Sequence, residues 1–398
     1  MDRLIRIGIV GSGFAAEFHY TAYQRVTGID VKVVGVTSLI EDKEHREDFT
    51  KKHGIKSFDS LEEMLPEVDV IDVCTPGYAH EEVSITALEA GKHIVVEKPF
   101  TGYFGPPGDE NFKGNLFPKE KMLEEAIASA RRIIAAALKS KKKLCYAENW
   151  IYAPAIQKEA EIITKTKGQI LWALGGGSHS GSLSPAYGIW RLSGGGSMVG
   201  KSCHPLTAVL YLKQVEGLAR NGKAIRPKAV SARTHEITRN PRFIDKGFLR
   251  TDYEDIEDYC NLHVVFDDGM VADVFASELV MGGVQNWLEI FANNHRIRCN
   301  LSPTNVIELY NPEEEQLSDV YVMEKIGTKQ GWSSPSPDEN WMFGYPQEIQ
   351  DFMDAIATGR EPKSGMLAAS DVVSVLYAAY LSAERKGTEV EIPLDSSI

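Results

Sequence analysis

Lys98 stands at a point in the chain where a side-chain amine could do proton chemistry. It follows a short apolar run, residues 94–96, that predicts a buried strand, and Pro99 directly after it prevents the strand from continuing. Open α/β sheets bind ligands beyond the carboxyl ends of their parallel strands, which is where this lysine is expected. A lysine that is partly desolvated and close to another cation has a lowered pKa and can take a proton from a hydroxyl group. The alternative is an ordinary solvated lysine at a strand end.

A second group of polar residues lies in the middle of the chain. Lys201 and His204 are three residues apart at the start of a predicted helix, so both side chains can lie on one face. If they converge with His179 and Arg191, they form a cationic pocket in a chain whose net charge is −13. Such a pocket favours a polyhydroxy substrate that carries a carboxylate. Tyr152 and His179 are expected at the pocket rim, with loop stabilisation as the alternative role.

A glycine-rich turn near the amino terminus has the pattern of a dinucleotide-binding loop. Residues 5–10 predict a strand, residues 11–16 spell Gly-Ser-Gly-Phe-Ala-Ala, and a helix is expected over residues 17–26. In this pattern Gly11 permits the tight turn. Gly13 lets the backbone approach a pyrophosphate at the helix amino terminus.

The end of the second predicted strand, residues 31–36, bears on the choice of cofactor. NAD-binding folds usually place an acidic residue there, whereas this chain has Thr37 and Ser38. Ser38 does not repel the 2′-phosphate of NADP, but only Lys43 or Arg46 could reach round to neutralise it. Because an uncompensated phosphate is costly to bury, the sequence favours NAD, with NADP as the alternative.

The first half of the chain alternates predicted strands and helices. Such alternation is typical of a parallel, doubly wound sheet, and it predicts a Rossmann domain over residues 1–150. Besides the elements already named, strands are expected at 68–74 and 144–149, with helices at 41–52, 61–65, 81–90 and 123–138.

Residues 151–398 predict an α+β domain that binds substrate, so the fold class of the whole chain is α/β. A linking helix is expected over 154–164, and helices over 347–358 and 368–386 are expected to pack back on the first domain. The strand and turn pattern between them predicts a large open sheet, mostly antiparallel. A homodimer or homotetramer is expected through its exposed face. The strands are expected at 169–174, 229–236, 259–266, 270–278, 287–292 and 296–301.

Three spaced motifs resemble those of the Gfo/Idh/MocA oxidoreductases. They are Thr-Pro-x-x-x-His at 75–80, Ala-Leu-x-Ala-Gly-Lys-His-x-x-x-Glu-Lys-Pro at 87–99, and the Trp-Arg and glycine-rich segment at 190–204. The resemblance implies a nicotinamide cofactor over the carboxyl ends of the strands, Lys98 as general acid/base and His204 beside the substrate hydroxyl. The cofactor contacts it implies are Gly11, Gly13, Phe14, Ala15, Thr37, Ser38, Thr75, Pro76, His80, Glu97, Lys98, Asn149, Trp190 and Arg191. The substrate contacts are Lys98, Tyr152, His179, Arg191, Lys201 and His204.

The chain departs from the family pattern in two places. Gly200 stands where the family has an aspartate four residues before the histidine, so an Asp–His pair is lost and Lys201 becomes the candidate replacement. Residues 101–121 form an insertion punctuated by glycine, proline and aromatic residues, directly after the strand that carries Lys98. We expect this insertion to act as a substrate lid.

Bulk composition narrows the function further. A net charge of −13 argues against nucleic acid and against an anionic membrane as partners. No uninterrupted run of eighteen apolar residues predicts a membrane span, and the first ten residues have no signal-peptide layout. The five cysteines are scattered and predict neither disulfides nor a metal site, which suits a reducing, cytoplasmic compartment.

These observations predict an NAD(P)-dependent dehydrogenase. It would oxidise a secondary hydroxyl of a sugar, sugar acid or cyclitol, with Lys98 as the proton acceptor. Two alternatives remain open at this point: a glycosidase that oxidises, eliminates and re-reduces with the same bound NAD, and a non-catalytic NAD sensor that binds a protein partner.

Overall fold

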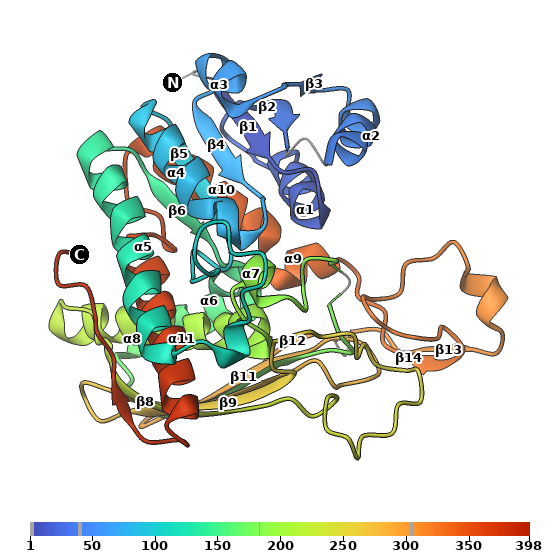
Figure 1. Ribbon diagram of the computed structural model, residues 1–398, viewed down its shortest axis with the longest axis vertical. Coiled ribbons are helices and arrows are strands. Elements are labelled where there is room, and N and C mark those ends of the chain that lie inside the picture. Colours follow the sequence, from blue (N-terminus) through green and yellow to red (C-terminus); the bar gives the residue numbers. More distant parts are fainter. Residues whose placement is uncertain (1–3, 39–41, 183, 303–305) are drawn as a thin grey trace.

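The computed structural model describes residues 4–38, 42–182, 184–302 and 306–398. Its first unit is a six-stranded parallel sheet in the order β3-β2-β1-β4-β5-β6, with helices on its faces (Figure 1). The strands are β1 Ile5–Val10, β2 Val31–Thr37, β3 Lys56–Ser57, β4 Val70–Val73, β5 His93–Glu97 and β6 Leu144–Ala147. The helices are α1 Phe14–Tyr23, α2 Lys43–His53, α3 Leu61–Met64, α4 His80–Glu89 and α5 Lys119–Ser140.

The central strands of this sheet are apolar because helices cover both of their faces. Every residue of β4 is buried, and the run from Ile94 to Val96 in β5 is inaccessible to solvent. The register pairs Val73 with Val96 and Glu97 with Ala147, so the carboxyl ends of β4, β5 and β6 lie side by side. Lys98 and Glu148, the residues that follow β5 and β6, therefore emerge at one edge of the sheet.

The second unit is a seven-stranded sheet in the order β12-β11-β7-β10-β9-β8-β15, in which β7 and β10 pair in parallel and the other neighbours are antiparallel. With the parallel first sheet, it confirms the predicted fold class. The strands are β7 Ile170–Ser178, β8 Pro227–His235, β9 Tyr259–Phe266, β10 Val271–Ser277, β11 Gln285–Ala292, β12 Arg296–Ser302 and β15 Val390–Glu391. The helices are α6 Pro154–Thr166, α7 Trp190–Ser193, α8 Cys203–Asn221 and α9 Glu339–Phe343, and a separate hairpin pairs β13 Leu309–Asn311 with β14 Gly331–Ser333.

Strand β7 runs four residues beyond the predicted end at Leu174, through three consecutive glycines. Glycine is unfavourable inside a strand, and for that reason the sequence predicted an earlier end. Here the missing side chains make room for neighbours on both faces of the sheet. A Cβ on Gly176 would lie 2.7 Å from Nε1 of Trp287, and a Cβ on Gly177 would lie 3.1 Å from the carbonyl oxygen of Lys201. The glycines thus let the start of α8 approach the sheet.

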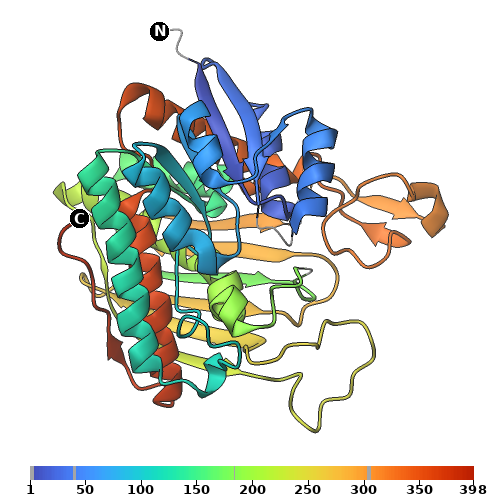
Figure 2. The same ribbon diagram turned by 45° about the horizontal axis from the view of Figure 1, so that its top comes forward.

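The last two long helices join the two units. Helix α10 Tyr345–Thr358 packs on α1, and α11 Met366–Glu384 lies beside α5 and against β8 (Figures 1 and 2). With a mean hydropathy of 1.5 over its apolar window, α11 is long and apolar enough to cross a membrane, yet 83% of that window is buried inside the protein. It packs as a core helix.

The insertion after Phe100 is a strap that packs against the second unit, and its role as a substrate lid stays a prediction. The Tyr103 N–H donates to the Tyr377 hydroxyl at 2.7 Å, and the Trp190 indole donates to the Tyr103 carbonyl at 3.1 Å. The Gly114 N–H donates to the buried Asp255 carboxylate at 2.7 Å. Because both ends of the segment are bonded to the second unit, it connects the two units in a fixed position.

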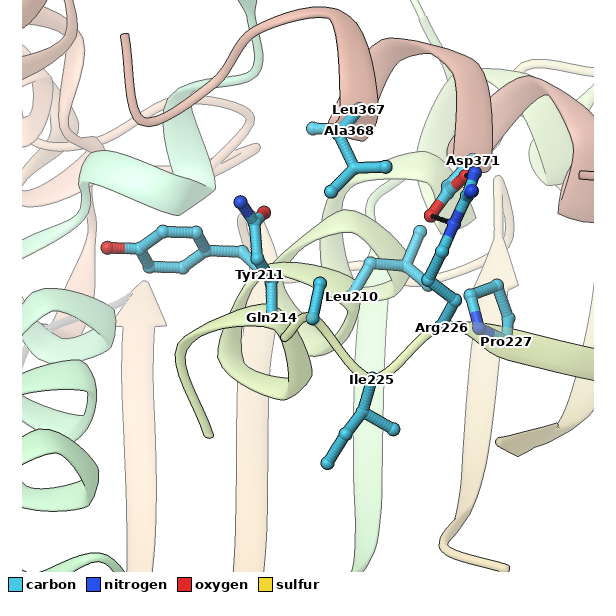
Figure 3. A pocket seen from close by; sticks show the side chains of 10 residues that line it. Leu210, Tyr211, Gln214, Ile225, Arg226, Pro227, Leu367, Ala368 and Asp371 are labelled. Carbon is cyan, nitrogen blue, oxygen red and sulfur yellow. Dashed lines mark hydrogen bonds and ion pairs between the residues drawn. The ribbon is translucent and has the colours of Figure 1, made fainter. Parts of the chain in front are cut away.

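A small cavity of about 10 Å³ lies between α8, α11 and the start of β8 (Figure 3). Its polar wall is an ion pair between Arg226 and Asp371, in which Nε lies 3.2 Å from Oδ2. This volume has room for about one water molecule, and the residues predicted to be functional do not line the cavity. It is a packing defect and not the candidate site.

We expect replacement of the two glycines of the first turn to have different effects on the free energy of unfolding. Gly11 has φ of +110°, and a Cβ there would lie 2.5 Å from the Cys74 carbonyl oxygen, whereas a Cβ on Gly13 would meet no atom within 4 Å. We expect Gly11→Ala to lower the free energy of unfolding by about 1–3 kcal/mol. We expect Gly13→Ala to change it by less than about 0.5 kcal/mol. Urea unfolding of the two variants checks this, and equal losses would contradict the close approach at Gly11.

Candidate active site

Lys98 is held at the end of β5 by a chain of buried charges. The Lys98 backbone N–H donates to Glu97 Oε2 at 2.8 Å, and Glu97 Oε1 lies 3.2 Å from Nε2 of His19 on α1. Nδ1 of the same ring lies 2.9 Å from Oδ2 of Asp72 on β4. Burial alone lowers the pKa of His19, but Asp72 more than compensates and raises it well above the ordinary value. The ring is therefore an imidazolium between two carboxylates, and it links α1, β4 and β5.

The Lys98 amine is half-buried, and no described residue accepts a hydrogen bond from it. Burial lowers the pKa of Lys98, but the acidic groups around the amine outweigh burial and raise it. Cys203 and Glu97 have the larger effects, and Glu148 and Glu278 have the smaller ones. The sequence predicted a lowered pKa, which is wrong for the protein without its cofactor. The physical reason is that carboxylates surround the amine, and they favour the ammonium form.

His204 is paired with a carboxylate that the sequence analysis did not identify. Its Nδ1 lies 2.6 Å from Oε1 of Glu148, a residue with no exposed surface at the end of β6. The other carboxylate oxygen, Oε2, is buried and has no hydrogen-bond partner among the described residues. With Glu148 ionised, Nδ1 carries the ring proton and Nε2 is left as an acceptor.

The pairing with Glu148 compensates for the aspartate that Gly200 replaces. A Cβ on Gly200 would lie 2.6 Å from the Tyr187 ring, so this position has no room for an aspartate side chain. Tyr187 instead donates its hydroxyl to Glu278 Oε1 at 2.6 Å. A charged acceptor is therefore supplied to His204 from β6 and not from its own helical turn.

Lys201 and His179 lie close enough to Lys98 for its charge to lower the pKa of both. Lys201, in the π-helical turn η6 Met198–Ser202, donates to the Ser182 hydroxyl at 2.9 Å and lies 3.3 Å from Glu278 Oε1. His179 Nδ1 accepts the Gly181 N–H at 3.0 Å. Burial first, and then the charges of Lys201, Lys325 and Lys98, lower the pKa of His179. The ring is therefore neutral, and Lys325, which the sequence analysis missed, belongs to this group.

The glycine-rich turn has the form of a phosphate cradle. The Gly11 N–H donates to the Thr37 carbonyl at 2.8 Å, which places the turn directly at the start of α1. Space around Gly13 is open, Phe14 is 65% exposed, and the buried Thr75 hydroxyl has no partner among the described residues. An open helix amino terminus beside an unsatisfied hydroxyl fits a dinucleotide.

The remaining motif residues of the first unit differ in their exposure to solvent. His80 is fully buried, and its two ring nitrogens each lie 2.9 Å from a carbonyl oxygen, of Pro99 and of Thr75. Burial lowers its pKa. His80 therefore holds the ends of β4 and β5 together. Pro76 is exposed beside Thr75, whereas Ala15 and Ser38 are half-buried near the glycine-rich turn.

Four predicted site residues contact parts of the protein other than the group around Lys98 and His204. The Tyr152 hydroxyl donates to Asp351 at 2.9 Å and accepts the Ser364 N–H, so this ring is part of the core between α6 and α10. The Asn149 amide donates to the Phe343 carbonyl at 2.9 Å. Trp190 is 2% exposed, packs against Tyr380 with ring centroids 4.8 Å apart and ring planes tilted by 48°, and lines a cavity of about 160 Å³ beside the strap. The charge of Arg191 acts on Lys113 of the strap.

Several residues that shape the site were not identified from the sequence. Glu148 follows a parallel strand, just as Lys98 does, so the same rule could have found it. Glu278 follows β10 in the same way. His19 and Asp72 carry no local signal, because their pairing joins residues 53 positions apart. Lys325 lies in an irregular segment that no periodic pattern marks.

Two groups of potential metal ligands come together, although the sequence predicted no metal. They are His19, Asp72 and Cys74, and Glu148, Cys203 and His204, with ligand atoms within 4.8 Å of one another in each group. In the second group the 2.6 Å separation of Nδ1 and Oε1 is that of a hydrogen bond. Burial raises the pKa of Cys203 to about 12, so its thiol is neutral at pH 7.

A parallel sheet with an open glycine-rich turn, followed by an open mostly antiparallel sheet, defines a two-unit dinucleotide-binding protein. Residues 5–104 match the family model GFO_IDH_MocA, described as "Oxidoreductase family, NAD-binding Rossmann fold". Over these residues the chain is similar to the Gfo/Idh/MocA oxidoreductase family.

Comparison with individual proteins agrees with this assignment. The chain is 33% identical over 94 residues to glucose-6-phosphate 3-dehydrogenase of Bacillus subtilis strain 168, a match that covers 24% of this chain and 26% of that protein. It is 27% identical over 215 residues to D-glucoside 3-dehydrogenase of Escherichia coli strain K12, covering 52% and 54%. The solved structure of GenD2, from gentamicin A biosynthesis in complex with NAD, has the same fold: the TM-score is 0.77, with 22% identity, over 99% of this chain and 97% of that one.

Proposed function

We propose that the protein is an NAD-dependent oxidoreductase that converts a secondary hydroxyl of a sugar, sugar acid or cyclitol to a carbonyl, and the reverse. The observation that carries the proposal is the position of Lys98: an amine with no acceptor among the described residues, next to the buried Glu148–His204 pair. The names of the two curated relatives, dehydrogenases of glucose 6-phosphate and of D-glucosides, support a sugar hydroxyl as the reacting group.

The two polar side chains have complementary tasks. Nε2 of His204, with Nδ1 donating to Glu148, accepts a hydrogen bond and orients a substrate hydroxyl. Lys98 takes the hydroxyl proton during oxidation and returns it during reduction. The nicotinamide ring, when bound, supplies the hydride acceptor. Because the pKa of Lys98 is raised in the free protein, the amine there carries a proton, and oxidation requires it to lose this proton first.

The preference for NAD over NADP is supported at the end of β2. Arg46 is buried and donates to the Phe58 carbonyl at 2.9 Å, and Lys43 lies 3.7 Å from Glu47. Arg46 is therefore not free for a 2′-phosphate, whereas the Lys43 side chain is 65% exposed. Asp42, in contrast, accepts a hydrogen bond from Ser12 of the glycine-rich turn at 2.7 Å, which places a carboxylate beside the cradle.

The predicted oligomer remains part of the proposal. The outer face of the second sheet carries a stacked pair, Trp172 and Phe291, with ring centroids 3.8 Å apart and ring planes at 3°. Leu171, Trp172 and Phe275 are 47%, 37% and 39% exposed. Exposed apolar residues on a sheet face support association of identical chains there.

Replacement of Lys98 tests the proposed chemistry directly. We expect Lys98→Met to reduce kcat for sugar oxidation by about 10²–10⁴-fold, because the base is removed. The Kd for NADH should change far less. Lys98→Arg keeps the charge but cannot release a proton at these pH values, and it should be equally inactive. A screen of sugars, sugar acids and cyclitols, followed by absorbance of the reduced cofactor, provides the assay.

The same screen distinguishes the rival functions. An active Lys98→Arg enzyme would contradict proton transfer by Lys98. Cleavage of a glycoside without net NADH would indicate an oxidation–elimination–reduction glycosidase instead, and NADH binding without any turnover would indicate a sensor.

Replacement of Glu148 should shift the pH dependence of kcat/KM in a direction that the structure predicts. The Glu148 carboxylate helps to raise the pKa of Lys98, so Glu148→Gln should lower that pKa. The rise of kcat/KM for oxidation with pH should therefore move to lower pH, with about a tenfold loss at its plateau because the charged partner of His204 is gone. Glu124→Gln, exposed on α5, is the matched control. A profile that keeps the wild-type midpoint would refute the coupling of Glu148 to Lys98.

Replacement of Asp42 tests the cofactor preference. We expect Asp42→Ser to improve NADPH binding relative to NADH by about 3- to 10-fold, because a carboxylate no longer opposes the 2′-phosphate. Fluorescence titration gives the two Kd values for each variant. Asp48→Ser, exposed on the same helix, changes the net charge equally and should leave the ratio as in wild type. If both substitutions shift the ratio alike, Asp42 has no specific role.

A further inference from the structure

Two lysines and a histidine meet at one short turn on the substrate side of Lys98. The turn comprises residues 179–182 and follows β7. Lys201 reaches it from η6 and donates to the Ser182 hydroxyl at 2.9 Å. Lys325 reaches it from the segment between β13 and β14 and donates to the Gly181 carbonyl oxygen. His179 begins the turn and accepts the Gly181 N–H at Nδ1. Three elements that are distant in sequence thus bring basic groups to the same place.

Glu278 is the carboxylate that directly contacts this group, and its oxygens are already bound. Oε1 accepts the Tyr187 hydroxyl at 2.6 Å and lies 3.3 Å from Lys201, and Oε2 accepts the Ser182 N–H at 3.1 Å. Its charge is shared among three donors, so it neutralises the turn only in part. Glu324 favours the charged form of Lys325 from the side of its own segment.

The basic groups repel one another across the pocket. Burial lowers the pKa of Lys201 most strongly. The charge of Glu278 opposes this effect, and the charge of Lys98 lowers the pKa further. Burial and Lys201 lower the pKa of Lys325, against the opposite effect of Glu324. Like charges held together in a partly buried pocket are unfavourable unless a ligand of opposite charge joins them. In a chain with a net charge of −13, such a concentration of cations stands out.

The neutral His179 adds a directed donor to this group. Because Nδ1 accepts the Gly181 N–H, the ring proton is on Nε2. Nε2 has no acceptor among the described residues. Two ammonium groups and one imidazole N–H are a donor set that suits a carboxylate or a phosphate monoester.

We propose that Lys201, Lys325 and His179 form a subsite for an anionic group of the substrate, a carboxylate or a phosphate on the sugar, at a position apart from the carbon that Lys98 and His204 serve. This inference rests on the proposed function and narrows its substrates to acidic carbohydrates. Lys325 is the residue that determines the preference, since it has no other part in the reaction.

Binding to the full-length protein, saturated with NADH so that the glycine-rich turn is filled, tests the subsite without turnover. The probes are inorganic phosphate, glucuronate and glucose at constant ionic strength, measured by calorimetry. We expect wild type to bind at least one of the two anions more tightly than glucose, and Lys325→Gln to weaken that binding by about 10- to 100-fold. Whether phosphate or glucuronate is bound distinguishes the two anionic groups.

Matched variants make the binding result interpretable. Lys246→Gln removes the same charge from an exposed loop position and should bind as wild type does. Lys325→Arg keeps the charge and should keep most of the binding, which shows that the loss in Lys325→Gln is not a folding defect. Equal anion binding by wild type and Lys325→Gln, or an equal loss in Lys246→Gln, would overturn the proposal.

Kinetics separate failure of the subsite from failure of the proposed function. The ratio of kcat/KM for glucuronate or glucose 6-phosphate to that for glucose should fall about tenfold or more in Lys325→Gln. Turnover of neutral and acidic sugars with a ratio that Lys325→Gln leaves unchanged would disprove the subsite and leave the oxidoreductase intact. Anion binding that depends on Lys325, without reduction of NAD by any sugar, would support the subsite and disprove the proposed reaction.

Discussion

The buried imidazolium of His19 is the interaction on which the rest of the site depends. It lies between Asp72 and Glu97, at 2.9 Å and 3.2 Å, with no solvent exposure of its own. Removal of one partner from such an arrangement leaves an uncompensated buried charge, which typically costs about 3–5 kcal/mol. The same ring therefore ties the phosphate-binding helix α1 to the strand end that carries Lys98. Dinucleotide binding and the position of the reacting amine are connected through a single side chain.

Carboxylates also contact the other basic side chains near Lys98. Glu148 pairs with His204, and Glu278 with Lys201, each from the residue that follows a strand. These contacts with carboxylates hold the side chains of His204 and Lys201 in position. Gly200 and the glycines of β7 make this possible, because they leave room for Tyr187 and for the start of α8. The replacement of an aspartate by glycine is thus one part of a rearranged charge network and not a simple loss.

Local patterns predicted the parts of the protein that depend on local chemistry. The strand before Lys98, the turn at Gly11 and the alternation of the first sheet follow from residue order, and the structure has them. The last four residues of strand β7 did not follow, because its glycines are explained only by contacts with Trp287 and α8. The contacts of Tyr152 and Asn149 run to Asp351 and Phe343, some two hundred residues away, so a motif could not reveal that both serve the core.

The direction of the Lys98 pKa shift has a consequence for how such a site works. An amine that Glu97, Glu148 and Glu278 stabilise as ammonium has a raised pKa, so it holds its proton more tightly and is a weaker acid than an ordinary lysine. Any positive charge brought close to it, including that of an oxidised nicotinamide ring, opposes the carboxylates and lowers its pKa. In the proposed reaction, the acidic surroundings keep the amine protonated in the free protein, and a bound oxidised nicotinamide ring favours loss of that proton.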